Sequence, residues 1–352
     1  DQSYQSLVEN SLVGVYIIQD GVFKFVNPRL CQILGYSEGE LIGKSVSQLV
    51  VPAYKEEVEE KIRQRMTGEV DAIHYSFQVF RKDGGIIDVE VYGSRIIYQG
   101  APAIHGTLLE ISERKRDEEF VKKQNRLLEQ IAGGSDLDEC LDNILHFLES
   151  YGKGIHCSVC LVDSSGTCLE LKNAPSLPEE VQDAFRNVKL QEEKSCCAQA
   201  VLRKKSVITA DITRETEPDL RKDVLLKHGY RACWSIPILS AENRVMGTLG
   251  MYSREARYPS EIELQLVEVG VNLISIAINK QERERQLRER ERWFRSIFET
   301  SAIGILLISP EGKLIANNTS FSKLLKYSSF DLAKKSFFDI LHPEDRSLNI
   351  NS

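Results

Sequence analysis

The sequence predicts an α+β protein of several domains, in which antiparallel sheets are joined by long helices. β-rich runs and short helical pieces alternate over residues 13–112 and again over 155–253. A charged helical stretch follows each of these regions, and the beginning of the chain recurs near its end. With 352 residues, the chain is too long for one ordinary core, which favours two or three domains.

Residues 1–115 form the first predicted domain. Two β-rich runs surround Asp20-Gly21, a pair typical of a hairpin turn. Short helical pieces follow, and Pro52 opens a helix over 52–66. Three further β-rich runs lie at 73–80, 85–98 and 102–112. This order predicts one antiparallel sheet with helices on one side.

A charged helix over 112–131 leads out of this domain. Four residues of this helix, Phe120, Gln124, Leu127 and Ile131, are separated by 4, 3 and 4 positions, which is the spacing of a short heptad seam. Gly133-Gly134 end the helix, and Ser135 or Asp136 can cap the next one. That next helix carries apolar residues on one face, namely Leu137, Leu141, Ile144, Leu145 and Leu148. We assign residues 116–133 as a helical linker.

Residues 134–278 form the second predicted domain. Its β-rich runs lie at 156–163, 167–174, 206–212, 231–239 and 245–253, with helices expected at 178–185 and 195–203. The closing helix, 260–278, continues without a breaker into the charged stretch 279–295.

Two interpretations of the stretch 279–295 remain open. Favourable pairs such as Glu284 with Arg288 suit a solvated single helix. Residues seven apart, namely Leu273, Lys280, Leu287 and Phe294, suit a parallel coiled coil in a dimer. The pattern favours the dimer, although Lys280 at a core position makes the seam thin.

An internal repeat relates the two ends of the chain. Residues 6–52 align with 296–343 across one gap, and identical residues occur at nine or more positions, including Glu9/Glu299, Gly14/Gly304, Gly21/Gly312, Asn27/Asn318, Leu34/Leu325, Tyr36/Tyr327, Ser37/Ser328, Leu41/Leu332 and Pro52/Pro343. One fold therefore occurs twice. The second copy, 296–352, has no counterpart of the last three β-rich runs. We expect an incomplete sheet there and a longer parent protein.

The first copy resembles a PAS domain over essentially all of 1–115. The motifs that carry the resemblance are "FVNPRLCQILGYSEGELIGKS", "FRKDGG" and the exit "LEISERKR". Glu110, Ile111 and Ser112 stand where the family has an Asp-Ile-Thr exit. The middle region resembles a GAF domain through "SCCAQAV", "ADI", "HGYRACWSIPIL" and "VMGTLGMYSRE".

A PAS–GAF–PAS order is similar to the sensory part of bacterial signalling proteins. The resemblance implies a cytoplasmic sensory and relay module that responds to a small molecule or a redox input. Coiled-coil linkers would pass a conformational change, through Glu110, Ile111, Ser112 and Leu287, to an output domain outside this sequence. That output would be the histidine kinase of a two-component system or a cyclic di-GMP cyclase or phosphodiesterase. The alternative is a dimerisation and relay scaffold with vestigial pockets.

Composition excludes several other classes of function. A net charge of −7 gives no support for nucleic-acid binding. No apolar run approaches the roughly 20 residues of a membrane helix. Phosphate loops, nucleophile elbows and zinc-protease helices are absent, so we expect no catalysis by this sequence.

The eight cysteines raise the question of a metal site. Cys157 and Cys160 have zinc-like spacing, but no second pair follows, and on a strand they would point to opposite faces. We expect reduced thiols and no metal.

Candidate pocket residues are Tyr16, Phe25, Cys31, His105, Cys196 and Trp234. PAS domains can hold haem or flavin, but the sequence has neither a haem attachment motif nor the photoreactive flavin motif, so the cofactor is unknown. Structural roles compete for most candidates: Cys31 and Trp234 suit a core, and His105 suits a strand surface. Adjacent Cys196 and Cys197 also suit a redox sensor. Asn27 is expected to cap the helix that follows it.

Overall fold

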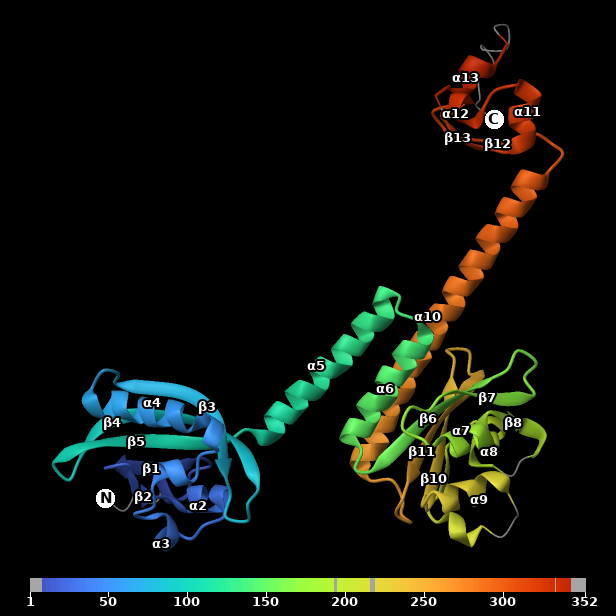
Figure 1. The fold of residues 1–352 in the computed structure, drawn as a ribbon. Coiled ribbons are helices and arrows are strands. Elements are labelled where there is room, and N and C mark those ends of the chain that lie inside the picture. The colour runs from blue at the N-terminus through green and yellow to red at the C-terminus, as the bar shows by residue number, and fades with distance from the viewer. Residues whose placement is uncertain (1–7, 193–194, 216–218, 333, 343–352) are drawn as a thin grey trace. The chain divides into compact units, whose positions relative to one another are not determined.

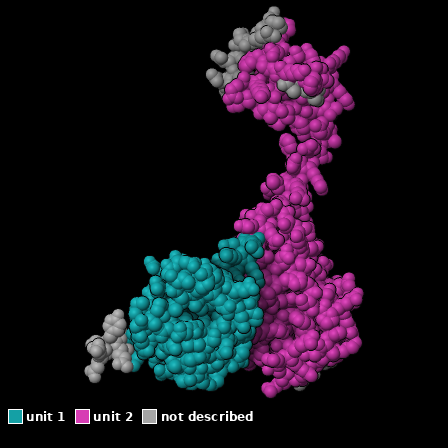
Figure 2. Space-filling model, turned by 60° about the vertical axis from the view of Figure 1, so that its left-hand side comes forward, with its two compact units in different colours: residues 1–126 teal, residues 127–352 magenta. Residues whose placement is uncertain are grey.

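The computed structural model describes residues 8–192, 195–215, 219–332 and 334–342. The chain divides into two compact units, residues 1–126 and 127–352, which Figure 2 shows in different colours.

The first unit is built on a five-stranded antiparallel sheet. Its strands are β1 (Gly14–Gln19), β2 (Val22–Val26), β3 (Ala72–Phe80), β4 (Ile86–Tyr98) and β5 (Ala101–Glu110), in the order β2-β1-β5-β4-β3. Asp20 and Gly21 both have positive φ, 56° and 74°, which suits the right-handed twist of a tight hairpin. The predicted hairpin and the single antiparallel sheet are confirmed.

Helices cover one face of this sheet (Figure 1). They are α2 (Pro28–Leu34), α3 (Glu38–Leu41) and α4 (Lys55–Thr67), with 3-10 turns at Val46–Gln48 and Pro52–Tyr54. Apolar side chains from these helices and from the inner face of the strands form one buried core. The helix predicted from Pro52 therefore begins as a 3-10 turn and becomes α-helical only at Lys55.

Helix α5 (Ser112–Gly133) follows β5 directly. The predicted seam has a graded burial, with Phe120 and Gln124 half-buried and Leu127 and Ile131 buried. Gly134 has a φ of +86°, a conformation that ends a helix. Of the two predicted caps, Asp136 begins α6 (Leu137–Tyr151) by accepting a hydrogen bond from the Asp138 N–H at 3.0 Å.

The second unit contains a six-stranded antiparallel sheet in the order β8-β7-β6-β11-β10-β9. Its strands are β6 (Ile155–Val162), β7 (Cys168–Asn173), β8 (Asn187–Lys189), β9 (Val207–Thr209), β10 (Ala232–Leu239) and β11 (Val245–Ser253). Eight of the nine residues of β11 are buried, as expected for a strand covered on both faces.

Helices cover both faces of this second sheet. On one face lie α6 and α10 (Glu261–Thr300), which run side by side (Figure 1). On the other face lie α7 (Glu179–Phe185), α8 (Cys196–Arg203) and α9 (Leu220–Lys227), with 3-10 turns at Leu190–Glu192 and Ile212–Arg214. The sequence pattern did not indicate β8 or α9. Strand β8 has three residues, and α9 begins with the exposed Leu220 followed by charged side chains, so neither shows a clear period.

A glycine allows α6 and α10 to pack closely. A Cβ atom added at Gly270 would lie 2.6 Å from Leu148 Cδ1. Helix α10 is unbroken over its 40 residues from Glu261 to Thr300, so the predicted continuity of this helix is confirmed. Its first half packs against the sheet, whereas almost every residue after Glu284 is exposed.

The second copy of the repeat follows α10. It contains β12 (Leu306–Ile308), β13 (Leu314–Asn317), α11 (Thr319–Leu325), α12 (Ser329–Leu332) and α13 (Phe337–Ile340). Among the described residues, β12 and β13 pair only with each other. Both copies carry a register shift in the first strand, between Ile17 and Ile18 and between Leu307 and Ile308. Residues 343–352, including Pro343 of the aligned pair, lie outside the described residues.

One asparagine in each copy makes the same four hydrogen bonds. Asn27 accepts from the N–H groups of Val15 and Leu30, at 2.8 and 2.9 Å. Its amide donates to the carbonyls of Val8 and Val13, at 3.0 and 3.1 Å. The predicted cap of α2 is therefore confirmed, and the same side chain also ties together the segment before β1.

Asn318 repeats this arrangement in the second copy. It accepts from Ile305 and Phe321 and donates to Phe298 and Ile303, all at 2.8–2.9 Å. Both asparagines are fully buried. The predicted repeat is therefore present down to individual hydrogen bonds.

No helix within the described ranges combines the length and the apolar character needed to cross a membrane.

Candidate functional site in the domain interiors and the helix junction

The first domain has a small cavity of about 30 Å³ between α4 and the sheet. By volume, it has room for about two water molecules. Most of its lining is apolar, and the polar groups are the phenols of Tyr16 and Tyr75 and the guanidinium of Arg65. Arg65 did not stand out in the sequence, because charged residues surround it on α4.

Of the predicted pocket residues in this domain, Tyr16 lines the cavity and Phe25 does not. The lining position on β2 belongs to Phe23. Strand β1 pairs Ile17 with Phe25 but Ile18 with Phe23, so Lys24 is an extra residue in β2. Such a bulge shifts the alternation of core-facing and solvent-facing residues along the strand. A prediction that assumes strict alternation therefore misassigns the residues beyond the bulge.

Cys31 and His105 also lie outside this cavity. Cys31 is half-buried against the core, and burial, followed by the nearby Glu38, raises the pKa of its thiol. His105 is exposed on the outer face of β5, where it lines a shallow hollow with His74 and Tyr92. Those two rings stack at a centroid distance of 3.9 Å. The four candidates of the first domain therefore do not share one site.

The predicted exit residues are held against the start of β4. Glu110 pairs with Arg81 at 2.8 Å. The N–H of the buried Ile111 donates to the Asp88 carbonyl, and the Ser112 hydroxyl accepts from the Asp88 N–H, both at 2.9 Å. The first turn of α5 is thus fastened to the sheet.

A group of thiols lies beneath α8 in the second domain. Cys196, the first residue of α8, has its Sγ 3.1 Å from Thr209 Oγ1 and lies beside Cys233. The hydrogen bond from the Cys233 thiol, aided by Thr209, lowers the pKa of Cys196 against the opposing effect of burial. Cys160 and Cys197 belong to the same buried cluster. Cys196 is therefore the thiol of this group best placed to react as a thiolate.

Trp234 lies on the opposite face of the sheet from Cys196. The neighbouring Cys233 packs in the cluster with α8, and side chains alternate along β10. The Trp234 ring instead meets the Arg257 guanidinium, 5.2 Å from the ring centroid. The two predicted pocket residues of this domain therefore do not come together.

Cys157 and Cys160 also occupy opposite faces, as the strand pattern predicted. Cys160 belongs to the thiol cluster beneath α8. Burial and the nearby Glu149 of α6 raise the pKa of Cys157, which places it on the α6 face. Within the described ranges, no three His, Cys, Asp or Glu side chains are arranged to hold a metal ion.

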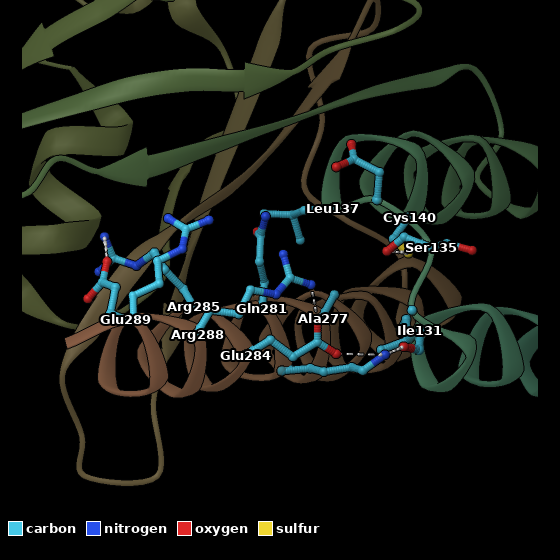
Figure 3. Close-up of a pocket in the computed structure, with 14 residues that line it drawn as sticks. Ile131, Ser135, Leu137, Cys140, Ala277, Gln281, Glu284, Arg285, Arg288 and Glu289 are labelled. Atoms are coloured by element: carbon cyan, nitrogen blue, oxygen red, sulfur yellow. Dashed lines mark hydrogen bonds and ion pairs between the residues drawn. The ribbon is translucent and has the colours of Figure 1, made fainter. Parts of the chain in front are cut away.

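Lys280 of α10 joins that helix to the end of α5. Lys280 Nζ donates to the carbonyls of Ile131 and Ala132, at 2.5 and 3.0 Å, and lies 3.4 Å from Glu284. A hollow of about 320 Å³ adjoins this contact, between the α5–α6 turn and α10 (Figure 3). Lys280 is therefore not an unfavourable core residue. It satisfies free carbonyls at the negative end of a helix.

Beyond this junction, α10 exposes apolar residues at heptad spacing. Leu287 is 67% exposed and Phe294 is 55% exposed, and Ile297 follows three residues later. Ion pairs such as Arg288 with Glu284, at 3.5 Å, and Arg295 with Glu291, at 3.1 Å, lie along the same segment.

Comparison with known families gives three matches along the chain. The PAS domain model matches residues 12–113, the GAF domain model matches 134–279, and a second PAS domain model matches 292–351. These intervals contain the first sheet, the second sheet and the second copy of the repeat.

Two curated proteins are similar to parts of the chain. The methyl sulfide methyltransferase-associated sensor of Methanosarcina acetivorans is 33% identical over 207 residues, which is 59% of this chain and 21% of that protein. Sporulation kinase A of Bacillus subtilis is 28% identical over 133 residues, which is 38% of this chain and 22% of that protein. The chain thus matches about a fifth of the length of each relative.

Among solved structures, the PAS domain of an HTR-like protein from Haloarcula marismortui is 26% identical. That match covers 31% of this chain and 90% of that one, with a TM-score of 0.28. The three family matches alone give the chain a PAS, a GAF and a second PAS domain match in that order, which is the domain order of a PAS–GAF–PAS signalling protein.

Proposed function

We propose that the chain is a sensory and signal-relay module that acts on an output domain outside this sequence. The observation that carries the proposal is the path of α10. One unbroken helix leaves the GAF sheet at Glu261 and reaches the second PAS copy at Thr300. Such a helix can carry a shift or rotation from one domain to the next.

The two ends of the relay support this proposal. Asp88 fastens the start of α5 to the first sheet, and Lys280 fastens the end of α5 to α10. Both contacts are hydrogen bonds to backbone groups. A movement of the first domain would therefore be transmitted through α5 to α10 while Ser112 and Lys280 keep the same hydrogen-bond partners. The states of such a relay need differ by only a few kcal/mol.

A second copy of the chain is the proposed partner of α10. A parallel coiled coil would bury Leu287, Phe294 and Ile297, which are exposed in the single chain. The ion pairs of this segment would stay on its outer face. N-terminal to Leu287 the apolar seam is interrupted, because Lys280 is hydrogen-bonded to the end of α5. The two α10 helices of the dimer could therefore separate in that part.

The proposed input is a small molecule in the PAS interior or oxidation of the GAF thiols. The proposed output is a histidine kinase or a cyclic di-GMP enzyme, and we assign no catalysis to these residues. Free cysteines, eight in all, favour a reducing cytoplasm. A second candidate function is a non-sensing relay scaffold, which the small size of the PAS cavity favours.

Native mass spectrometry of the 352-residue chain, with an absorption spectrum of the same sample, tests the proposal. A dimer with extra bound mass or a visible band supports the sensor. A dimer of bare polypeptide supports the scaffold. A monomer at micromolar concentration contradicts the coiled-coil relay.

A further inference from the structure

The PAS cavity contains a buried cation whose hydrogen bonds are incomplete. Arg65 is 2% exposed. Its Nε donates to the Lys61 carbonyl at 3.0 Å, and its Nη2 donates weakly to the Tyr75 hydroxyl at 3.4 Å. Nη1 is buried and has no hydrogen-bond partner in the described part of the chain. Leaving a charged donor unsatisfied in this way is costly, so the site calls for an acceptor.

The sheet beneath Arg65 is kept free of side chains. Gly93 of β4 pairs directly with Gly106 of β5. A Cβ atom at Gly93 would lie 2.3 Å from Arg65 Nη1, and one at Gly106 would lie 2.4 Å from the Tyr16 hydroxyl. Glycine weakens a strand interior, and close approach of another group is the usual reason for it. Here the two glycines make room for the polar ends of Arg65 and Tyr16.

The described lining of this site offers Arg65 no counter-anion. None of the described residues that line the cavity is Asp or Glu. Burial raises the pKa of Tyr16 and of Tyr75 and outweighs the opposing effect of the Arg65 guanidinium on each, so both phenols stay neutral at physiological pH. Each phenol keeps an O–H that can donate. The polar groups are therefore one guanidinium and two hydroxyl donors, set in an apolar wall.

We propose that the PAS cavity binds a small carboxylate of one or two carbons, such as formate or acetate. One carboxylate oxygen accepts from Arg65 Nη1, and the other accepts from the Tyr75 hydroxyl. Arginine and carboxylate match in charge and in planar geometry. A water molecule would satisfy the hydrogen bond but would leave the charge uncompensated.

Cavity size and wall chemistry set the length of this ligand. A volume of about 30 Å³ has room for the three heavy atoms of formate, and the fourth heavy atom of acetate requires a small movement of the wall. The apolar wall around Val91 and Leu108 suits a methyl group and gives no second charged partner for a dicarboxylate. This assignment rests on the ligand-sensing form of the proposed function.

Isothermal titration of the full chain with sodium acetate and sodium formate tests the assignment. Acetamide, the neutral analogue of acetate, and sodium chloride at equal ionic strength are the comparison ligands. We expect saturable binding of a carboxylate and binding of acetamide at least tenfold weaker. Equal binding of acetamide, or of chloride, would overturn the carboxylate assignment, and so would no binding at all.

Arg65→Met is the decisive variant, with Arg63→Met as its matched control. Arg63 lies on the same helix, is exposed and pairs with Glu60 and Glu69. We expect at least a tenfold loss of carboxylate affinity for Arg65→Met and no change for Arg63→Met. Unchanged affinity in Arg65→Met means that Arg65 is a structural cation, and the proposal fails.

A second variant covers the case in which Arg65→Met fails to fold. Tyr75→Phe removes only the hydroxyl oxygen, and a loss of affinity is expected there too. If Tyr75→Phe binds as tightly as the unaltered chain, the proposed contacts are wrong. A different molecule found bound by native mass spectrometry would leave the sensory function standing while overturning the carboxylate.

Discussion

At the scale of single residues, Asn27 and Asn318 define the entry into each PAS copy. Each uses its carbonyl oxygen to cap a helix and its amide to hold the preceding segment. The cap could be predicted, because Asn before a short apolar helix follows a local rule. The bonds to the preceding segment could not, because they depend on where that segment lies in the folded chain.

Replacement of Asn27 by Ala tests this network. We expect a loss of about 3 kcal/mol, because two buried N–H groups lose their acceptor and one of them is the Leu30 N–H that Asn27 caps in α2. Amide hydrogen exchange across β1 and α2 of the full chain measures the effect. Asn27→Asp is the control, since it keeps the acceptor and should retain part of the stability. Exchange in Asn27→Ala equal to that of the unaltered chain would contradict the network.

The lowered pKa of Cys196 predicts its reactivity. Among the clustered thiols, which are Cys160, Cys196, Cys197 and Cys233, we expect iodoacetamide to modify Cys196 first, because the thiolate is the nucleophile. Peptide mass spectrometry of the native chain measures the order of modification. Thr209→Val removes a hydrogen bond to Sγ and should slow the reaction. If Cys197 or Cys233 reacts first, this assignment is wrong.

At the scale of elements, the start of α10 depends on Glu263. Its carboxylate receives two hydrogen bonds from Arg257, both at 2.7 Å, and completes a capping box with Ser260. Burial alone would raise the pKa of Glu263, but these hydrogen bonds outweigh it and lower the pKa below its ordinary value of 4.5.

The lowered pKa of Glu263 gives a pH-dependent stability. The ionised form is favoured in the folded state, so its contribution is present above the ordinary pKa and is lost as the pH falls through the folded value. We expect Glu263→Gln to cost about 2 kcal/mol at neutral pH and much less in acid. Urea unfolding followed by fluorescence of the buried Trp234 measures this. The exposed neighbour Glu261→Gln is the control, and a pH-independent difference would contradict the argument.

The junction of α5 and α10 makes a second prediction at this scale. Lys280→Met keeps an apolar stem but removes the charge that caps α5. We expect a loss of about 1 kcal/mol and faster amide exchange near Ile131, because the free carbonyls and the negative end of the helix lose a cation. Arg283→Met, an exposed change on the same helix, should alter neither. Unchanged exchange near Ile131 in Lys280→Met would remove Lys280 from the relay.

Most elements followed from local patterns, and the exceptions have physical reasons. Short β8 and weakly amphipathic α9 lack a clear period. The bulge at Lys24 reverses the alternation of β2, so Phe23 and not Phe25 lines the cavity. Neither the weak periodicity of β8 and α9 nor the bulge in β2 can be recognised from a single sequence.

At the scale of the whole molecule, the exposed apolar residues of α10, namely Leu287, Phe294 and Ile297, predict a dimer of two chains. We expect Leu287→Glu to raise the dissociation constant of the proposed dimer at least tenfold, because a charge would be placed in its core. Analytical ultracentrifugation of the full chain measures this. Gln281→Glu adds the same charge off the seam and should leave the dimer intact. Dimerisation that is unaffected by Leu287→Glu would place the interface elsewhere.

The sequence by itself determined the domain order, the repeat, the hairpin at Asp20-Gly21 and the continuity of α10. These features rest on contacts between near neighbours in the chain, and residue type is enough to predict them. Only the tertiary structure decided that Lys280 caps α5 and that Trp234 and Cys196 lie on opposite faces of the second sheet. It also decided that Arg65 packs over Gly93 of the first sheet. Each of these depends on which segments, distant in the sequence, come into contact in the fold. Those contacts are set by a strand bulge or by helix packing, and the residue pattern of one segment does not reveal either.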